Sequence, residues 1–445
     1  RASTAQPTNM EGYWKGSLKF GNKHIPLIFN FIKQPDGAYK ATFDSPDEHL
    51  FSLRCSLITT TMDSLHVEAE VVKSIYNGCI KKDSIVGEWK QGMANLPLTL
   101  YRTSAKDALQ AKPQTPIPPY PYNTEDVQYK SADGKINYGA TITSPKDALK
   151  HPAVVLISGS GQQDRDCNIM GHKWFLVLAD YLTRKGFVVL RIDDRGIGQT
   201  TGEVLNATDA DFATDMEQGI RYIETRKEVD VKKIGLIGHS AGGTIAPMVA
   251  ARNKDVAFIV MLAGPAVGGT ILNEEQNVAI VRKQGLSDSA IQEFRIFHRK
   301  LQQAAIHAKD DKEFETMVRA AFVLTNQNPK PGEAEIMGTI KAYNGLRIPW
   351  TKFYMTYQPT KDIAKLKIPV LALNGSKDTQ VYAEMNLPVI KKALQKGNVL
   401  NKIVKLDGLN HLFQKCTTGE IDEYGKIEET INPLALKTIG DWLIQ

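Results

Sequence analysis

Three residues in the second half of the chain could together form a nucleophilic site. Ser240 stands in GLIGHSAGG, residues 235–243, where glycines flank the serine in the pattern G-x-S-x-G. Asp378 follows the apolar run PVLALN, and His411 follows KIVKL. A serine nucleophile needs a base that takes its proton and a carboxylate that orients the base. In this chain order the three residues are candidates for a catalytic triad.

Other residues could take the same roles. Asp407, four residues before His411, is the rival acid, and His239 and His172 are the rival bases. We expect His239 to be structural, because a residue next to the serine on a tight turn points away from the reacting face. Ser240 itself could be no more than the cap of a strand-to-helix turn.

A serine nucleophile also requires backbone N–H groups that stabilise the oxyanion of the tetrahedral intermediate. The N–H of Ala241, directly after the serine, is one predicted donor. The second is expected from the loop SGSGQQDRD, where Ser160 is the preferred residue and Gly161 the alternative. A phosphate-binding role for this loop is disfavoured, because no lysine follows at the spacing of a P-loop. Chemistry of this kind needs no metal and no cofactor.

These residues lie in a region where short apolar runs alternate with helical patterns. The runs are rich in Val, Ile and Leu, as strands buried on both faces must be, and they span residues 153–157, 187–192, 233–238, 257–262, 369–374 and 402–406. This alternation predicts an α/β fold with a doubly wound, mostly parallel sheet. Ser240 would then stand on a nucleophile elbow between a strand and a helix. The candidate acid and base would follow later strands at the same edge.

Residues 270–355 interrupt this alternation with amphipathic helical patterns, which predicts a helical lid. Glu274 and Glu275, at its start, could anchor a substrate ammonium or simply be exposed helix-cap acids. Asp209 is predicted to cap the helix that contains Phe212. Arg195, in RIDDRGIGQTTG, is expected to pair with the adjacent aspartates rather than to bind substrate.

Residues 1–104 differ from the rest of the chain. Short alternating runs separated by turn signals predict a small all-β domain, and the proline-rich residues 105–126 predict an extended linker before a catalytic domain at 127–445. The all-β domain could stabilise the protein, form a dimer or recognise a ligand. If a disulfide forms here, Cys55 and Cys79 are the preferred pair.

Composition narrows the class of protein. The chain has 445 residues, of which 42% are hydrophobic and 23% charged, with a net charge of +6, which is typical of a globular protein. Lysines and arginines are scattered, so we do not expect nucleic-acid binding. No apolar stretch reaches the ~18 residues of a membrane span. The start, RASTAQPTN, resembles a chain whose secretory signal has been removed, which predicts an exported protein, periplasmic or secreted.

From about residue 127 to 445 the chain resembles the α/β-hydrolase superfamily, in its serine aminopeptidase-like and small-ester esterase branch. The matching stretches are SGSGQQDRD, DDRGIGQTTG, GHSAGG, WTKFYMTYQP, LNGSKDTQV and GLNHLFQ, in this order. The resemblance implies hydrolysis of carboxylic esters with Ser240, Asp378 and His411 as the triad. The N-terminal β domain resembles one attached to exported bacterial esterases. One departure is Ser158, where many relatives carry histidine.

The resulting prediction is an exported serine hydrolase that cleaves esters of small or medium acyl groups through an acyl-enzyme. A serine aminopeptidase of the same fold is the first alternative. A binding protein without catalysis on a hydrolase scaffold is the second.

Overall fold

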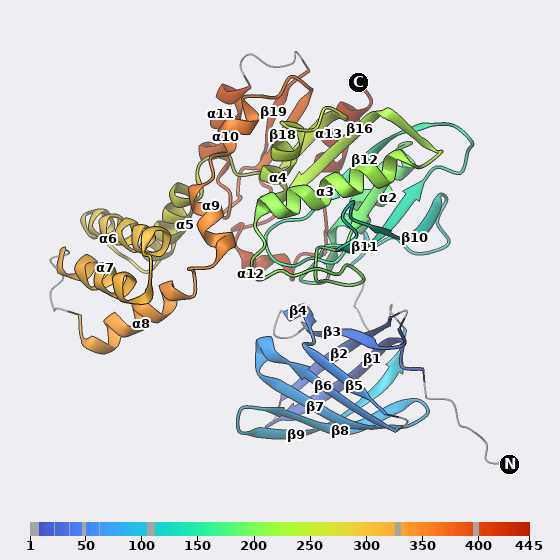
Figure 1. The fold of residues 1–445 in the computed structure, drawn as a ribbon, viewed down its shortest axis with the longest axis horizontal. Helices are drawn as coiled ribbons and strands as arrows, with labels where there is room; N and C mark the ends of the chain where they lie inside the picture. Colours follow the sequence, from blue (N-terminus) through green and yellow to red (C-terminus); the bar gives the residue numbers. More distant parts are fainter. Residues whose placement is uncertain are drawn as a thin grey trace.

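The computed structural model describes residues 9–21, 23–34, 36–46, 50–61, 63–104, 112–324, 331–394 and 400–445. Two large sheets form, one before residue 104 and one after residue 122 (Figure 1). Each packs around its own apolar side chains. No helix in these ranges combines the length and apolarity that crossing a bilayer requires.

The first sheet is entirely antiparallel, in the order β4-β3-β2-β1-β9-β8-β7-β6-β5. Its strands are β1 (Gly12–Phe20), β2 (Lys23–Lys33), β3 (Tyr39–Ser45), β4 (Leu50–Arg54), β5 (Leu57–Thr60), β6 (Ser64–Ala69), β7 (Ser74–Ile80), β8 (Ser84–Gln91) and β9 (Ala94–Thr103), with a 3₁₀ turn η2 (Glu70–Val72).

The two ends of this sheet adjoin at the link between β4 and β5. The N–H of Cys55 donates to the carbonyl of Ala41 in β3 at 2.9 Å, and the N–H of Ser56 donates to Glu68 in β6 at 2.7 Å. The sheet therefore curls on itself (Figure 1). Alternate side chains such as Leu65 and Val67 lie in its core. The prediction of a small all-β domain is confirmed.

The Cys55–Cys79 pair, preferred if a disulfide formed in this domain, is not joined. Both cysteines are free, and they differ in placement, since Cys55 is buried in the core while Cys79 is exposed on β7. Burial raises the pKa of the Cys55 thiol to about 12, as expected for a thiol packed among apolar side chains. The two sulfurs lie on opposite sides of the sheet, which spacing in the chain does not reveal.

The second sheet has the order β10-β11-β15-β12-β16-β17-β18-β19, and every pair from β15 onward is parallel. The first two pairs, β10 with β11 and β11 with β15, are antiparallel. The strands are β10 (Asn123–Lys130), β11 (Asn137–Ser144), β12 (His151–Ile157), β15 (Val188–Ile192), β16 (Val229–His239), β17 (Val256–Leu262), β18 (Val370–Gly375) and β19 (Lys402–Leu406), and a separate small ribbon joins β13 (Asn168–Ile169) to β14 (His172–Lys173).

Helices cover both faces of this sheet. Val155 packs in the core under α3 (Asp209–Glu224), α4 (Ala241–Ala250), α10 (Pro359–Ile363) and α11 (Ala383–Ala393). Val154, one residue earlier, packs on the other face against α2 (Trp174–Arg184), α12 (Ile421–Tyr424) and α13 (Pro433–Leu443). Strands covered on both faces must be apolar throughout, which explains their uninterrupted runs. The predicted doubly wound, mostly parallel sheet is confirmed.

Among the described residues, α10 and five further helices lie between β17 and β18, and these five occupy the region where the sequence predicts a lid. They are α5 (Gly269–Lys283), α6 (Asp288–His307), α7 (Asp311–Leu324), α8 (Glu333–Asn344) and α9 (Pro349–Thr356). Helices α6 and α7 share a small core that includes Leu301 and Phe314, so the insertion has packing of its own. Figure 1 shows α6, α7 and α8 extending away from the sheet, while α9 returns toward it.

Candidate active site

Ser240 stands between β16 and α4 in a strained backbone conformation. Its φ is 55°, in the left-handed region that non-glycine residues rarely adopt. The turn is held because the Ser240 N–H donates to Leu262 O and the Ser240 carbonyl accepts from the Gly243 N–H, each at 2.8 Å. A Cβ on Gly238 would lie 1.9 Å from the Gly242 carbonyl oxygen, so the helix can approach the strand only over glycine. This is the geometry of a nucleophile elbow.

Asp378 and His411 meet beyond the ends of β18 and β19. The Nδ1 of His411 lies 2.8 Å from Oδ2 of Asp378, and the two residues are 3% and 4% exposed respectively. The other carboxylate oxygen of Asp378 accepts from the N–H groups of Gln380 and Val381, both at 2.8 Å. A carboxylate held this way fixes the tautomer of the imidazole, which leaves Nε2 as the basic nitrogen.

The rival acid is bound elsewhere. Asp407 is paired with the hydroxyl of Ser376, which donates to it at 3.0 Å on the exposed side of the loop. Nδ1 of His411 donates to Asp378 instead. The structure thus brings together His411 and the acid predicted for it.

Neither rival histidine takes the position of the base. His172 is buried between the hydroxyl of Thr430 and the carbonyl of Tyr424, at 2.8 Å from each. His239 donates from Nε2 to the backbone carbonyl of His411 at 2.9 Å, and burial lowers its pKa to about 3. It supports the loop that carries His411, a role that its place beside the serine did not reveal.

The predicted oxyanion loop packs directly on the elbow. A Cβ on Gly159 would lie 3.2 Å from Cβ of Ser240, and one on Gly242 would lie 2.2 Å from the carbonyl oxygen of Ile157. Ala241 is the first residue of α4, so its N–H has no intrahelical partner. Ser160 and Ala241 both line one cavity beside the serine. The two predicted N–H donors therefore belong to segments in direct contact.

Ser158 and Asp194 brace this loop, and the sequence reasoning missed the pair. The Ser158 hydroxyl lies 2.7 and 2.9 Å from the two oxygens of Asp194, and the Gln163 N–H donates to the same carboxylate at 2.9 Å. Burial raises the pKa of Asp194 to about 7. The signal was available, because the second aspartate of RIDDRG follows β15 at the edge where the loop begins.

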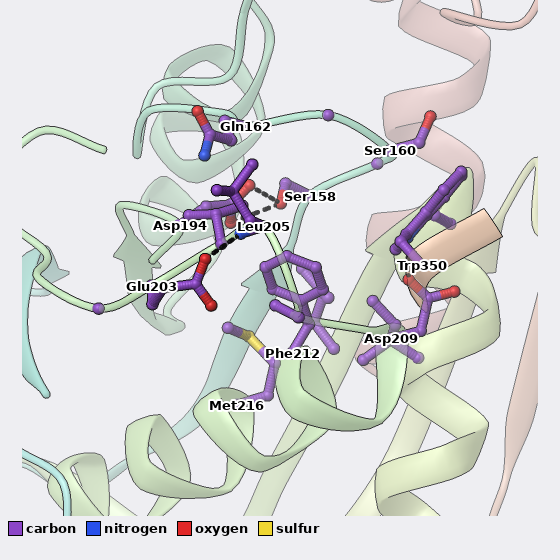
Figure 2. A pocket seen from close by; sticks show the side chains of 18 of the residues that line it. Ser158, Ser160, Gln162, Asp194, Glu203, Leu205, Asp209, Phe212, Met216 and Trp350 are labelled. Carbon is purple, nitrogen blue, oxygen red and sulfur yellow. Dashed lines mark hydrogen bonds between the residues drawn. The ribbon is translucent and has the colours of Figure 1, made fainter. Parts of the chain in front are cut away.

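The cavity beside the elbow has a volume of about 840 Å³. Its wall is mostly apolar and combines the loop after β12, helix α3, the segment before α3 and helix α9 (Figure 2). The residues include Ile157, Val204, Leu205, Ala207, Phe212, Met216, Ile245, Ile348 and Trp350, with Arg54, Gln162, Asp194, Glu203 and Asp209 as long or charged polar side chains. A pocket of this size and character suits a small organic ligand.

Asp209 is not the cap that the sequence suggested. It is the first residue of α3, after the N-cap Thr208, and its carboxylate accepts from Nε1 of Trp350 at 2.8 Å. This bond ties helix α9 to the cavity wall. Burial raises the pKa of Asp209 to about 6.

Arg195 also has a different partner from the one expected. It binds the carboxylate of Asp215 in α3 with two hydrogen bonds of 2.7 Å, whereas Asp193 is bound by Arg165. Arg195 is therefore in a structural ion pair, but not with the aspartates next to it in the chain.

The acidic pair at the start of the insertion is occupied by arginines. Glu274 accepts from Arg295 at 2.7 Å and from Arg299 at 2.5 Å, and Glu275 is bound by Arg295 as well. Burial raises the pKa of Glu274, but these hydrogen bonds outweigh it and the net shift is downward. Neither carboxylate is free to anchor an ammonium group.

Comparisons with known proteins agree with this architecture. The family model "Serine aminopeptidase, S33" matches residues 169–333, which include Ser240. Esterase EstD of Thermotoga maritima is 25% identical over 333 residues, 74% of this chain and 69% of that protein. An uncharacterised 31.7 kDa protein of Escherichia coli is 26% identical over 269 residues, 60% of this chain and 85% of its own length.

Among solved structures, the Pyrococcus furiosus esterase Pf2001 matches 75% of this chain and 96% of its own, with 14% identity and a TM-score of 0.44. The α/β hydrolase GrgF of a Penicillium species covers 72% and 98%, also with 14% identity and a TM-score of 0.44. The sheet order, the family match and the EstD relative together support an α/β-hydrolase fold, a similarity to the serine aminopeptidase-like and esterase branch, and an esterase-type hydrolase.

Proposed function

We propose that the protein is a serine hydrolase that cleaves carboxylic esters of small or medium acyl groups through an acyl-enzyme intermediate. The observation that carries the proposal is the buried 2.8 Å hydrogen bond from His411 to Asp378, at the sheet edge where Ser240 occupies its strained turn. A buried base oriented by a carboxylate, at the same sheet edge as a serine on a strained turn, is an arrangement suited to acyl transfer.

In the proposed acylation, Ser240 Oγ attacks the ester carbonyl carbon while Nε2 of His411 accepts the hydroxyl proton. Asp378 keeps the Nδ1–H bond and stabilises the imidazolium that forms. The N–H groups of Ala241 and Ser160 receive the oxyanion. When the bond to the alcohol oxygen breaks, His411 returns the proton to that oxygen, and the acyl group stays on Ser240.

Deacylation repeats these steps with water. A water molecule attacks the acyl carbon and gives one proton to His411, and the bond to Ser240 Oγ then breaks as the proton returns to that oxygen. The products are one carboxylic acid and one alcohol, and the enzyme is regenerated. The helix that begins at Ala241 points its positive N-terminal end at this centre, which favours the negative charge of both tetrahedral intermediates.

The apolar cavity supports the choice of acyl groups. Phe212 and Met216 from α3 and Trp350 from α9 form much of its wall (Figure 2). At about 840 Å³ it has room for a short or medium chain and the alcohol, and its apolar wall stabilises hydrocarbon removed from water. The carboxylates in the wall accept hydrogen bonds from their own neighbours, so none of these three acids is an unpaired charge facing the hydrocarbon.

The Ser240→Ala variant tests the proposal. We expect kcat/KM on 4-nitrophenyl butyrate to fall by ~10³-fold or more, with circular dichroism unchanged, because only the nucleophile is removed. Ser289→Ala, an exposed serine on α6, is the matched control. A fluorophosphonate probe should label the wild type on the peptide that contains Ser240. Wild-type turnover by Ser240→Ala, or absence of labelling, would favour the non-catalytic alternative.

A second pair of variants identifies the acid. Asp378→Asn should lower kcat by ~10³-fold, because the imidazole loses the partner that fixes its tautomer. Asp407→Asn should keep most of the activity, since that carboxylate binds Ser376 instead. The reverse result would assign the acid to Asp407.

The aminopeptidase alternative is separated by substrate. Turnover of aminoacyl 4-nitroanilides is compared with turnover of 4-nitrophenyl esters. The arginine-bound state of Glu274 and Glu275 favours the ester, because a peptidase anchor at this place would have to give up two or three charged hydrogen bonds. Export is also part of the proposal, on the resemblance of the N-terminal β domain to those of exported bacterial esterases, and cell fractionation tests it.

A further inference from the structure

Arg54, the last residue of strand β4, belongs to the N-terminal β domain but lines the cavity beside the elbow. The same wall includes Gly159 and Ser160 of the predicted oxyanion loop and Ala241 after the serine. Arg54 is exposed, so its guanidinium is accessible from that space. A residue nearly two hundred positions before the nucleophile is therefore part of the site.

The contact between the β domain and the cavity rim has a specific geometry. A Cβ on Gly196, where φ is +76°, would lie 3.5 Å from Nη1 of Arg54 and 2.6 Å from a methyl of Val204. A second cation of the β domain, Lys40, donates to the carbonyl of Gly198 at 3.2 Å. The β domain thus rests on the glycine-containing loop after β15, and that loop forms one rim of the cavity.

The three carboxylates of the cavity already hold donors of their own. Asp194 accepts from Ser158 and Gln163, and Asp209 accepts from Trp350. Glu203 accepts from the N–H group of Leu205 (Figure 2) and from the N–H group of Asn206.

Arg54 differs from these three acids. Within the described ranges, its guanidinium has neither an ion pair nor a hydrogen bond, and Glu203 in the same wall is not within pairing distance of it. Burial and the neighbouring Arg54 both lower the pKa of Lys40, which indicates that positive charge is concentrated at this rim. A guanidinium presents five N–H donors in a planar fork that fits a carboxylate with two parallel bonds.

We propose that the N-terminal β domain selects the substrate: Arg54 binds a carboxylate carried by the ester, so the preferred substrates are esters with a free acid group on the acyl or the alcohol side. This inference rests on the proposed esterase function and deepens it. It gives the β domain a role in substrate recognition at the active site, where the sequence left open stabilisation, dimer formation or ligand recognition.

The test compares esters that differ only in this charge. On the acyl side, 4-nitrophenyl hemiadipate is paired with its neutral adipamide analogue. On the alcohol side, 4-acetoxybenzoate is paired with 4-acetoxybenzamide. For each pair the ratio of kcat/KM, acid over amide, is measured at low and at high salt, because an accessible guanidinium is screened by salt. The pair with the ratio above one shows which side of the ester faces Arg54.

Variants then assign the preference to the side chain. In Arg54→Ala the acid-over-amide ratio should fall about tenfold, mostly through KM, and Arg54→Lys should recover part of it because charge remains without the fork. Glu203→Gln should raise the ratio about twofold, because a like charge leaves the wall. Lys90→Ala, an exposed cation on β8 of the same domain, is the control and should leave the ratio unchanged.

The outcomes separate the two proposals. A wild type that hydrolyses the amide analogues but shows no preference for the acids overturns the role of Arg54 and leaves the esterase proposal intact. A ratio that is unchanged in Arg54→Ala does the same. A wild type that hydrolyses none of the four esters contradicts the proposed function itself.

Discussion

Replacing His239 by phenylalanine tests whether the histidine beside the nucleophile positions the base. The ring of His239 packs on Trp174 with a centroid distance of 4.7 Å, and its Nε2–H donates to the carbonyl of His411 at 2.9 Å. Trp174 donates in the same way to the next carbonyl, that of Leu412, at 2.9 Å. Two aromatic N–H groups thus hold two successive carbonyls of the loop that carries the base.

Phenylalanine keeps the stacked ring but has no N–H, so the change isolates the hydrogen bond. A buried carbonyl left without its donor costs ~1–3 kcal/mol, and we expect the free energy of unfolding to fall by about 2 kcal/mol. If about two thirds of that cost, ~1.4 kcal/mol, is expressed as displacement of His411 in the transition state, kcat falls about tenfold. KM should change little, because His239 is not in the cavity wall.

The assay measures kcat and KM on 4-nitrophenyl butyrate, divided by the number of active sites titrated with a fluorophosphonate, and unfolding in urea. His24→Phe, the same substitution at an exposed residue of β2, is the control. A His239→Phe enzyme with wild-type kcat per active site would refute the positioning role. A loss confined to the number of active sites would show a purely structural one.

Two further predictions follow from the elbow and from the brace of the oxyanion loop. Gly238→Ala should lower the free energy of unfolding by more than ~3 kcal/mol, because the added Cβ would lie 1.9 Å from the Gly242 carbonyl oxygen. Gly338→Ala, in the exposed helix α8, is the control, and its Cβ would point into open space. In the same urea titration this control should raise the free energy of unfolding by ~0.5–1 kcal/mol. Burial raises the pKa of Asp194 to about 7, above its unfolded value near ~4, so the stability that neutral Asp194 contributes is complete below about pH 4 and is lost as pH rises to about 7. The unfolding free energy of wild type should therefore fall relative to Asp194→Asn over this range, and a difference independent of pH would contradict the assignment.

The architecture was predictable because a parallel sheet converts chain order into spatial order. Asp378 and His411 follow two strands that pair in parallel, β18 and β19, so their loops had to leave the sheet at one edge. Uninterrupted apolar runs indicated strands covered on both faces. The long interval between the fourth and fifth apolar runs carries amphipathic helical patterns, and helices α5 to α10 lie in it.

Partner choices were not predictable, because they depend on where side chains point after the chain has folded. Arg195 pairs with Asp215 one helix away rather than with its neighbours, since the α3 carboxylate presents both oxygens to the fork. Cys55 and Cys79 both lie in or beside strands, but one is buried in the core of the first sheet and the other is exposed to solvent. Strand alternation decides that difference, and a register shift of one residue reverses it.

The wall of the cavity shows why substrate specificity was the property hardest to predict from the sequence. Its chemistry comes from segments without a motif: the segment before α3 with Glu203, helix α9 with Trp350, and strand β4 with Arg54. A catalytic constellation requires fixed residue types at strand ends, so it leaves a pattern in the sequence. A selecting side chain needs only to reach the cavity, and Arg54 reaches it across a domain contact that no local pattern encodes. For this reason the charge of the substrate is best determined by changing the β domain rather than the hydrolase core.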